Sequence, residues 1–270
     1  MYHAPGKLLL YCAYRIEVEH ISASGDSKTI SGTAFYAIKD GKQFLVTNRH
    51  NVDAAMKNIK YAGYQMANIR VSGYFGGEHL VGDFAGQEIF LGFPQNSIED
   101  VAAIDVTSAT YHVNKSKNMM TNYVGQSLIA SDAELSKLDI CDMVALPGYP
   151  DFYDRNGDRP IMRMGTIASD PASDYRDHEM EPGRRIAYEA FSSSGSSGSP
   201  VFALAKGFKG GVGITGGYVR ELKLIGINAG HLNGRDGMQS HHSGISYCFK
   251  STCILDAMND AVAQQTKSLA

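Results

Sequence analysis

Short segments in which apolar and polar residues alternate recur along the chain and predict β-strands. Residues 14–19 alternate with a period of two, which places their apolar side chains on one face of a strand. The apolar runs 33–38 and 43–47 flank Asp40-Gly41, and an Asp-Gly pair between two such runs predicts a β-hairpin. Similar runs predict further strands at 68–71, 89–92, 101–106, 143–147, 185–191, 201–205 and 222–227.

Only one segment has a clear helical pattern. Residues 251–266 carry apolar side chains at helical spacing, including Ile254, Met258 and Ala261. Many short strands with one C-terminal helix indicate an all-β protein built as a sandwich or a barrel. The stretch near 111–131 has a weak pattern and is interpreted as a connection. We therefore expect one domain at 1–120 and a second at 121–270.

The composition narrows the classes of function. The 270 residues carry a net charge of -3 and form no basic cluster, which argues against nucleic acid as a partner. No apolar run approaches the roughly 18 residues that a membrane span requires, so no membrane partner is expected. The apolar run at 7–14 is too short for a signal peptide, and charged residues follow it directly. We therefore expect a cytoplasmic protein.

The cysteines and histidines do not indicate a metal site. The four cysteines (Cys12, Cys141, Cys248 and Cys253) are scattered and form no C-x-x-C pair, so neither zinc nor a disulfide framework is indicated. The two adjacent histidines at 241–242 have no carboxylate or cysteine at the spacing that a metal site requires. We expect reduced thiols, no metal and no cofactor.

The serine- and glycine-rich run at 191–202 is the most informative segment for function. Its composition alone is typical of a flexible linker. However, it leads directly into the apolar strand 201–205, as a tight turn that carries a nucleophilic serine would. Two other segments favour this second interpretation, because His50 closely follows the strand 43–47 and Asp100 opens the strand 101–106.

Serine, histidine and aspartate are the residue types that nucleophilic catalysis needs. A serine hydroxyl is a weak nucleophile at neutral pH and requires a base that removes its proton. A histidine titrates near neutral pH, and a buried carboxylate orients it and stabilises its protonated form. Each residue alone has an ordinary structural explanation, but together they favour a catalytic site. Asp105, in the same strand as Asp100, is interpreted as a polar residue that faces solvent.

These segments resemble the trypsin/chymotrypsin-like serine peptidases, whose triad residues follow the order His, Asp, Ser. Residues 47–50 match the family's T-x-x-H, residues 100–102 match D-[hydrophobic]-A, and residues 195–200 match G-[DNS]-S-G-[GS]-P. The closest likeness is to the bacterial glutamyl-endopeptidase-like and HtrA-like branches. The resemblance extends over about residues 14–257.

The resemblance implies two perpendicular six-stranded β-barrels with an active site in the cleft between them. His50 and Asp100 would belong to the first barrel and Ser197 to the second. Ser197 is then the nucleophile, His50 the general base and acid, and Asp100 the group that orients His50. The backbone N–H groups of Gly195 and Ser197 would form the oxyanion hole. The implied partner is a protein or peptide substrate.

The resemblance also suggests the residues of the primary specificity pocket, namely Phe191, Asn228, Ala229, Gly230 and Gly244. Phe191 stands where the family's pocket base lies, and the absence of aspartate there argues against a preference for Lys or Arg. We predict cleavage after a small or medium uncharged residue. Ser196 replaces the aspartate of zymogen-type relatives, so activation through a newly cut amino terminus is not expected.

Two alternatives stay open from the sequence. A catalytically silent protein of the same fold would act as a protein-binding module. An acyl hydrolase of another class would favour G-x-S-x-G on an α/β fold, but this chain lacks the alternating helices of such folds. A regulatory partner protein is compatible with the peptidase and with the binding module.

Overall fold

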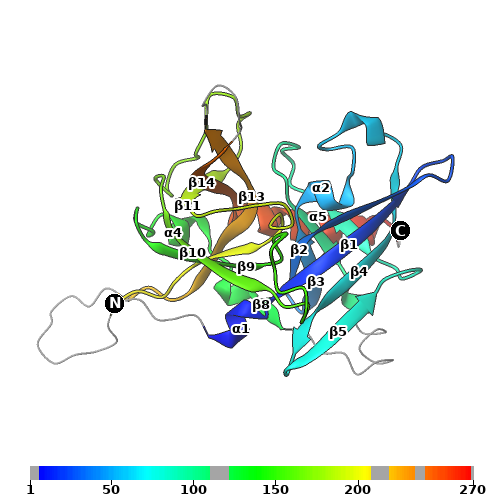
Figure 1. Ribbon diagram of the computed structural model, residues 1–270, viewed down its shortest axis with the longest axis horizontal. Helices are drawn as coiled ribbons and strands as arrows, with labels where there is room; N and C mark the ends of the chain where they lie inside the picture. The colour runs from blue at the N-terminus through cyan, green and yellow to red at the C-terminus, as the bar shows by residue number, and fades with distance from the viewer. Residues whose placement is uncertain (1–5, 110–121, 208–218, 235–240, 269–270) are drawn as a thin grey trace, which may run out of the picture.

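The computed structural model describes residues 6–109, 122–207, 219–234 and 241–268. Within these residues the protein consists mainly of β-strands in two halves that lie side by side (Figure 1). The C-terminal helix α5, Ser251–Ser268, packs against strands of both halves. The all-β fold with a C-terminal helix is therefore confirmed. The domain boundary predicted between residues 120 and 121 lies outside the described residues.

The N-terminal half is an eight-stranded sheet. Seven strands follow the order β5-β4-β1-β2-β3-β7-β6, and β8 pairs with β2 in parallel. The strands are β1 (Ala13–Ile21), β2 (Ser27–Lys39), β3 (Lys42–Thr47), β4 (Gln65–Phe75), β5 (Glu78–Asp83), β6 (Phe90–Gly92), β7 (Ala102–Asp105) and β8 (Tyr123–Gly125). The expected hairpin joins β2 to β3. Asp40 and Gly41 both have positive φ angles, of 50° and 76°, as a two-residue type I′ turn requires.

The C-terminal half is a closed six-stranded barrel of order β10-β11-β14-β13-β12-β9. Its strands are β9 (Met143–Gly148), β10 (Ile161–Ile167), β11 (Arg185–Glu189), β12 (Pro200–Ala203), β13 (Lys223–Gly234) and β14 (His241–Lys250). The short helices are α1 (Lys7–Leu10), α2 (Arg49–Val52) and α4 (Asp132–Leu135), with 3-10 turns η1 (Ile59–Tyr61) and η2 (Gln126–Leu128). Each strand expected from the alternating pattern overlaps one of these strands, whereas β5, β8, β10 and β14 were not expected from it, and β8 lies inside the segment interpreted as a connection.

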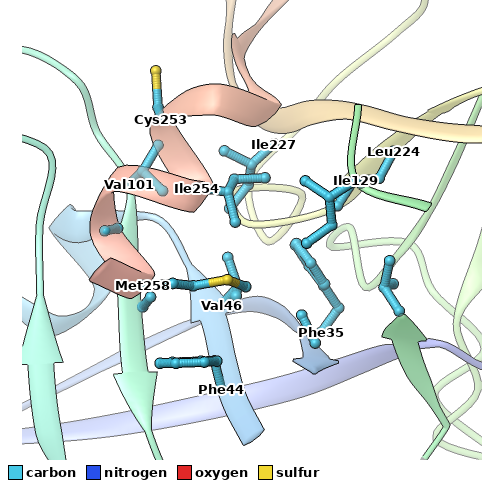
Figure 2. Close-up of a cluster of buried hydrophobic side chains, with 14 of the residues drawn as sticks. Phe35, Phe44, Val46, Val101, Ile129, Leu224, Ile227, Cys253, Ile254 and Met258 are labelled. Atoms are coloured by element: carbon cyan, nitrogen blue, oxygen red, sulfur yellow. The ribbon is translucent and has the colours of Figure 1, made fainter. Parts of the chain in front are cut away.

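A cluster of buried side chains joins the two halves (Figure 2). Phe35 and Val46 enter it from the N-terminal half, Ile227 enters it from the barrel, and helix α5 contributes Ile254 and Met258. All five are almost completely buried. Because one apolar core serves both halves and the helix, the halves are held in a fixed relation, which a site made from both of them needs.

Removal of one helix side chain should measure how much this core contributes. Ile254→Ala leaves a cavity among completely buried neighbours, so we expect a loss of about 2–5 kcal/mol in the free energy of unfolding, measured with urea. Ile59→Ala is the matched control, because Ile59 is 81% exposed and its truncation should change the stability by less than about 0.5 kcal/mol. Equal losses in the two variants would contradict the proposed role of helix α5.

Candidate active site

His50 and Asp100 form a buried pair at one end of the N-terminal sheet. His50 lies in the short helix α2 directly after β3, and Asp100 lies just before β7, the strand that pairs with β3. The His50 Nδ1 atom lies 2.6 Å from Asp100 Oδ2, and the His50 backbone N–H donates to Asp100 Oδ1 at 2.9 Å. The carboxylate therefore holds both the ring and the backbone of the histidine.

The surroundings of Asp100 keep its side chain ionised. Burial alone would raise the pKa of this carboxyl, but the hydrogen bonds and charge of His50, together with the charge of Lys57, hold the pKa below its usual value. The Asn48 side chain donates to the Asp100 backbone carbonyl at 2.6 Å. This bond holds the backbone just before β7 against the end of β3. When the His50 ring is neutral, the carboxylate can only accept, so Nδ1 carries the proton and Nε2 is the acceptor.

Glu99 anchors Asp100 to the second half of the molecule. Its carboxylate is 2% exposed and accepts from Arg184 Nε at 2.8 Å and from Arg184 Nη2 at 2.6 Å. Arg184 also reaches Asp256 of helix α5 at 2.7 Å. Burial tends to raise the pKa of Glu99, and the Arg184 contacts outweigh that effect and lower it. Sequence reasoning missed this network, because its members are far apart along the chain.

Asp105 differs from its sequence interpretation. It is 2% exposed and does not face solvent, and its Oδ2 atom lies 3.0 Å from Lys42 Nζ. Its other oxygen accepts from the Thr107 hydroxyl at 2.6 Å. The lysine on the paired strand β3 compensates for the burial of this carboxylate, so Asp105 has a structural partner of its own.

Ser197 lies in the turn between β11 and β12, and Thr33 of the other half binds this turn. The Thr33 backbone N–H donates to the Ser197 carbonyl at 2.8 Å, and the Thr33 hydroxyl donates to the Gly195 carbonyl at 2.7 Å. The turn itself requires glycine, because Gly195 and Gly198 have φ angles of 81° and 92°. A Cβ atom on Gly195 would also lie 2.3 Å from the Tyr149 carbonyl oxygen.

The backbone N–H groups of this turn that have no acceptor among the described residues include those of Gly195 and Ser197. The Ser194 carbonyl accepts from the Asp151 N–H at 2.9 Å, and the Ser196 carbonyl accepts from the Ser199 N–H at 3.0 Å. In a planar trans peptide the N–H points opposite to the carbonyl, so both N–H groups are directed away from these internal bonds. They are available to an external anion or oxyanion.

Lys57 contacts the ring nitrogen of His50 that does not face Asp100. Its Nζ atom lies 3.1 Å from His50 Nε2, the atom that would accept a proton from a nucleophile. Among the described residues, no hydrogen bond joins the Ser197 hydroxyl to His50. In this arrangement the Lys57 amine lies against His50 Nε2, so this nitrogen is not open to another donor. The sequence held no signal for this contact, because η1 and the loop before it have no marked pattern.

The residues expected to form a specificity pocket lie at one end of the barrel. Phe191 is 68% exposed, and its ring packs against His242, which in turn stacks on His231. The Gly244 carbonyl accepts from the Ala190 N–H at 3.1 Å, so Gly244 lies beside the start of the Ser197 turn.

The other expected pocket residues lie in β13. Asn228 is completely buried and Ala229 is 5% exposed. Gly230 lies beside the Tyr247 ring, because a Cβ atom there would lie 2.8 Å from the Tyr247 hydroxyl. Asn228 therefore lies beneath the Ser197 turn and has no surface that a substrate could touch.

A separate cavity borders Gly195 on the other side of the turn. Its volume is about 360 Å³. Arg15 and Gly32 of the N-terminal half line it, together with Tyr149, Asp151 and Gly195 of the barrel. Gly195 therefore belongs both to the Ser197 turn and to the wall of this cavity.

Comparison with known proteins shows the fold. No protein-family model matches the chain, and no curated protein matches its sequence. The crystal structure of Deg5 aligns with a TM-score of 0.51 at 13% identity, over 92% of this chain and 89% of Deg5. The active form of the Rv3671c protease from M. tuberculosis aligns with a TM-score of 0.52 at 16% identity, over 94% of this chain and 82% of that protease.

The fold common to this chain and these structures is trypsin-like, with a closed six-stranded barrel beside a second β-sheet. At this level of identity the likeness establishes the architecture, and it confirms the fold that the sequence motifs implied. Within the described residues, no helix is both long enough and apolar enough to cross a membrane.

The Asp100–His50 pair should give the stability a dependence on pH. Because the pKa of folded Asp100 lies below the usual 3.8, its contribution is present at neutral pH and is lost as the pH falls through 3.8 and below. Asp100→Asn removes that contribution, so we expect a deficit of about 1–3 kcal/mol at pH 7 that becomes smaller at pH 3. Urea unfolding at the two pH values measures the difference, and an equal deficit at both would contradict this assignment.

Proposed function

We propose that this protein is a serine endopeptidase that cleaves peptide bonds through an acyl-enzyme. One observation carries the proposal. The Asp100–His50 pair and the Ser197 turn come from different halves of a trypsin-like fold, and Thr33 hydrogen-bonds the turn to the sheet that bears the pair. The two unpaired N–H groups on the turn add support, as does the likeness to a structure described as a protease.

In this mechanism Lys57 first withdraws from His50 Nε2. The Ser197 hydroxyl then gives its proton to Nε2 while its oxygen attacks the carbonyl carbon of the substrate. The carbonyl oxygen gains a negative charge and accepts hydrogen bonds from the Gly195 and Ser197 N–H groups. His50 passes the proton to the leaving amine as the carbon–nitrogen bond breaks. Water then attacks the acyl-enzyme by the same route and releases Ser197.

The Asp100 carboxylate stays ionised throughout these steps. It holds His50 in the tautomer that leaves Nε2 basic, and it stabilises the positively charged ring that forms after proton transfer. The departing segment of the peptide leaves through the cavity lined by Arg15, Tyr149 and Asp151. The acyl portion is bound at the end of the barrel near Phe191 and Gly244. No metal or cofactor takes part in this proposal.

A second candidate function is a catalytically silent module that binds proteins through the same cleft. The contact of Lys57 with His50 favours it, because the lysine occupies the nitrogen that catalysis needs. The two candidates differ in chemistry, since only the peptidase has a serine that reacts with an acylating or phosphonylating reagent.

Labelling with a fluorophosphonate probe separates the two candidates. We expect the wild-type protein to be labelled at Ser197 and the Ser197→Ala variant to be unlabelled, because the probe reacts only with an activated nucleophile. Ser193→Ala is the matched control, since it changes a serine of the same turn and should keep the labelling. In-gel fluorescence and mass spectrometry of the labelled peptide provide the measurement. Labelling that persists in Ser197→Ala would show that another residue is the nucleophile.

Replacement of Lys57 tests whether it restrains the site. Lys57→Met keeps the length of the side chain and removes the amine, so we expect the labelling rate to rise by about 3–10-fold, since one hydrogen bond contributes about 1 kcal/mol net. Lys60→Met is the control, because Lys60 lies over the Tyr61 ring and does not contact His50. A slower reaction of Lys57→Met would mean that the lysine assists the reaction.

A further inference from the structure

Asn228 makes an unusual number of contacts with the Ser197 turn. It is completely buried in β13, and its backbone N–H and carbonyl both form hydrogen bonds with the turn. Its N–H donates to the Ser199 carbonyl at 2.9 Å, and its carbonyl accepts from the Gly198 N–H at 3.1 Å. Its side-chain amide donates to the Ser196 carbonyl at 2.9 Å and to the Ser192 hydroxyl at 3.3 Å.

The orientation of the Asn228 amide is fixed by its partners. The Ser196 carbonyl can only accept, so the NH₂ group of Asn228 has to face it. The other end of the amide, Oδ1, accepts from the Tyr188 hydroxyl at 2.5 Å. Tyr188 is completely buried in β11, and burial raises the pKa of its hydroxyl well above the usual value. The tyrosine therefore stays protonated at neutral pH and donates to Asn228.

This bond to Ser196 determines where the next N–H points. The peptide between Ser196 and Ser197 is planar, so the carbonyl held by Asn228 directs the Ser197 N–H to the opposite side. Ser196 is itself completely buried, and its hydroxyl accepts from the Ser193 N–H at 3.2 Å. The direction of the Gly195 N–H depends instead on the bond between the Asp151 N–H and the Ser194 carbonyl.

We propose that Asn228, held by Tyr188, is the positioning residue that directs the Ser197 N–H toward the negative charge that develops during acyl transfer. The inference rests on the proposed peptidase function, and it adds how the orientation of one oxyanion-hole donor, the Ser197 N–H, is fixed. Without the Asn228 amide, the buried Ser196 carbonyl keeps only the Ser199 N–H, so one hydrogen bond instead of two holds the orientation of this peptide. The Ser197 N–H then loses its fixed direction while the nucleophile and its base remain.

The test compares Asn228→Ala and Tyr188→Phe with the wild type in fluorophosphonate labelling. For Asn228→Ala we expect a labelling rate about 10²–10³-fold lower, the usual effect of removing one oxyanion donor. For Tyr188→Phe, which keeps the ring and the amide, we expect a loss of about tenfold. Tyr36→Phe is the control, because Tyr36 is a buried tyrosine of the other half, and its rate should equal that of the wild type.

A spectroscopic signal distinguishes positioning from general damage. The proton between His50 Nδ1 and Asp100 should give a low-field NMR resonance, since the two atoms lie 2.6 Å apart. We expect this resonance to persist in Asn228→Ala and Tyr188→Phe while the labelling rate falls. Labelling at the wild-type rate in both variants would overturn the proposal. Loss of both the low-field resonance and the labelling in both variants would also overturn it. If Asn228→Ala does not fold, the volume-conserving Tyr188→Phe carries the test.

Failure of the peptidase function itself gives a different result. In that case even the wild-type protein would not be labelled, and the orientation of the turn is then judged by amide hydrogen exchange at Ser197. The free N–H should exchange fast in the wild type, and its rate should change when Asn228→Ala releases the peptide. Equal Ser197 exchange rates in the two proteins would overturn the role of Asn228 independently of any activity.

Discussion

The hydrogen bonds of Thr33 hold the candidate site together. This completely buried residue of β2 binds the Ser197 turn through its N–H and its hydroxyl, and its hydroxyl also accepts from the Tyr149 N–H at 3.0 Å. Its carbonyl accepts from the Thr47 hydroxyl at 2.8 Å, only three residues before His50. One side chain and its peptide groups therefore link the strand that leads to His50 with the turn that bears Ser197, across the junction of the two halves.

The charged groups around this link follow one rule, which is that each buried acid has several donors. Asp100 has the ring and backbone of His50, and Glu99 has the guanidinium of Arg184. The resulting low pKa values keep both carboxylates ionised, so neighbouring residues of one segment carry two fixed negative charges. One of them orients the histidine, and the other fastens the segment to the barrel and to helix α5.

The sequence predicts those parts of the molecule that local chemistry determines. The Asp40-Gly41 turn, the alternating strands and the amphipathic helix each follow from a few consecutive residues, and the order of His50, Asp100 and Ser197 suggested the fold. The contacts of Thr33, Lys57 and Tyr188 could not be found in this way, because each depends on which strands become neighbours. Asn228 was predicted as a pocket residue from its position in the fold family, and the structure adds that it is completely buried and hydrogen-bonded to the Ser197 turn.

The position of helix α5 along the chain also sets an order of events during synthesis. The core that joins the two halves needs Ile254 and Met258, which leave the ribosome after every strand of both halves. The sheet and the barrel can each begin to form earlier, as units of a growing chain do. The core that fixes their mutual alignment is complete only once helix α5 has been made. Until then a nascent chain lacks the buried contacts of that core, which hold the sheet that carries His50 beside the barrel that carries Ser197.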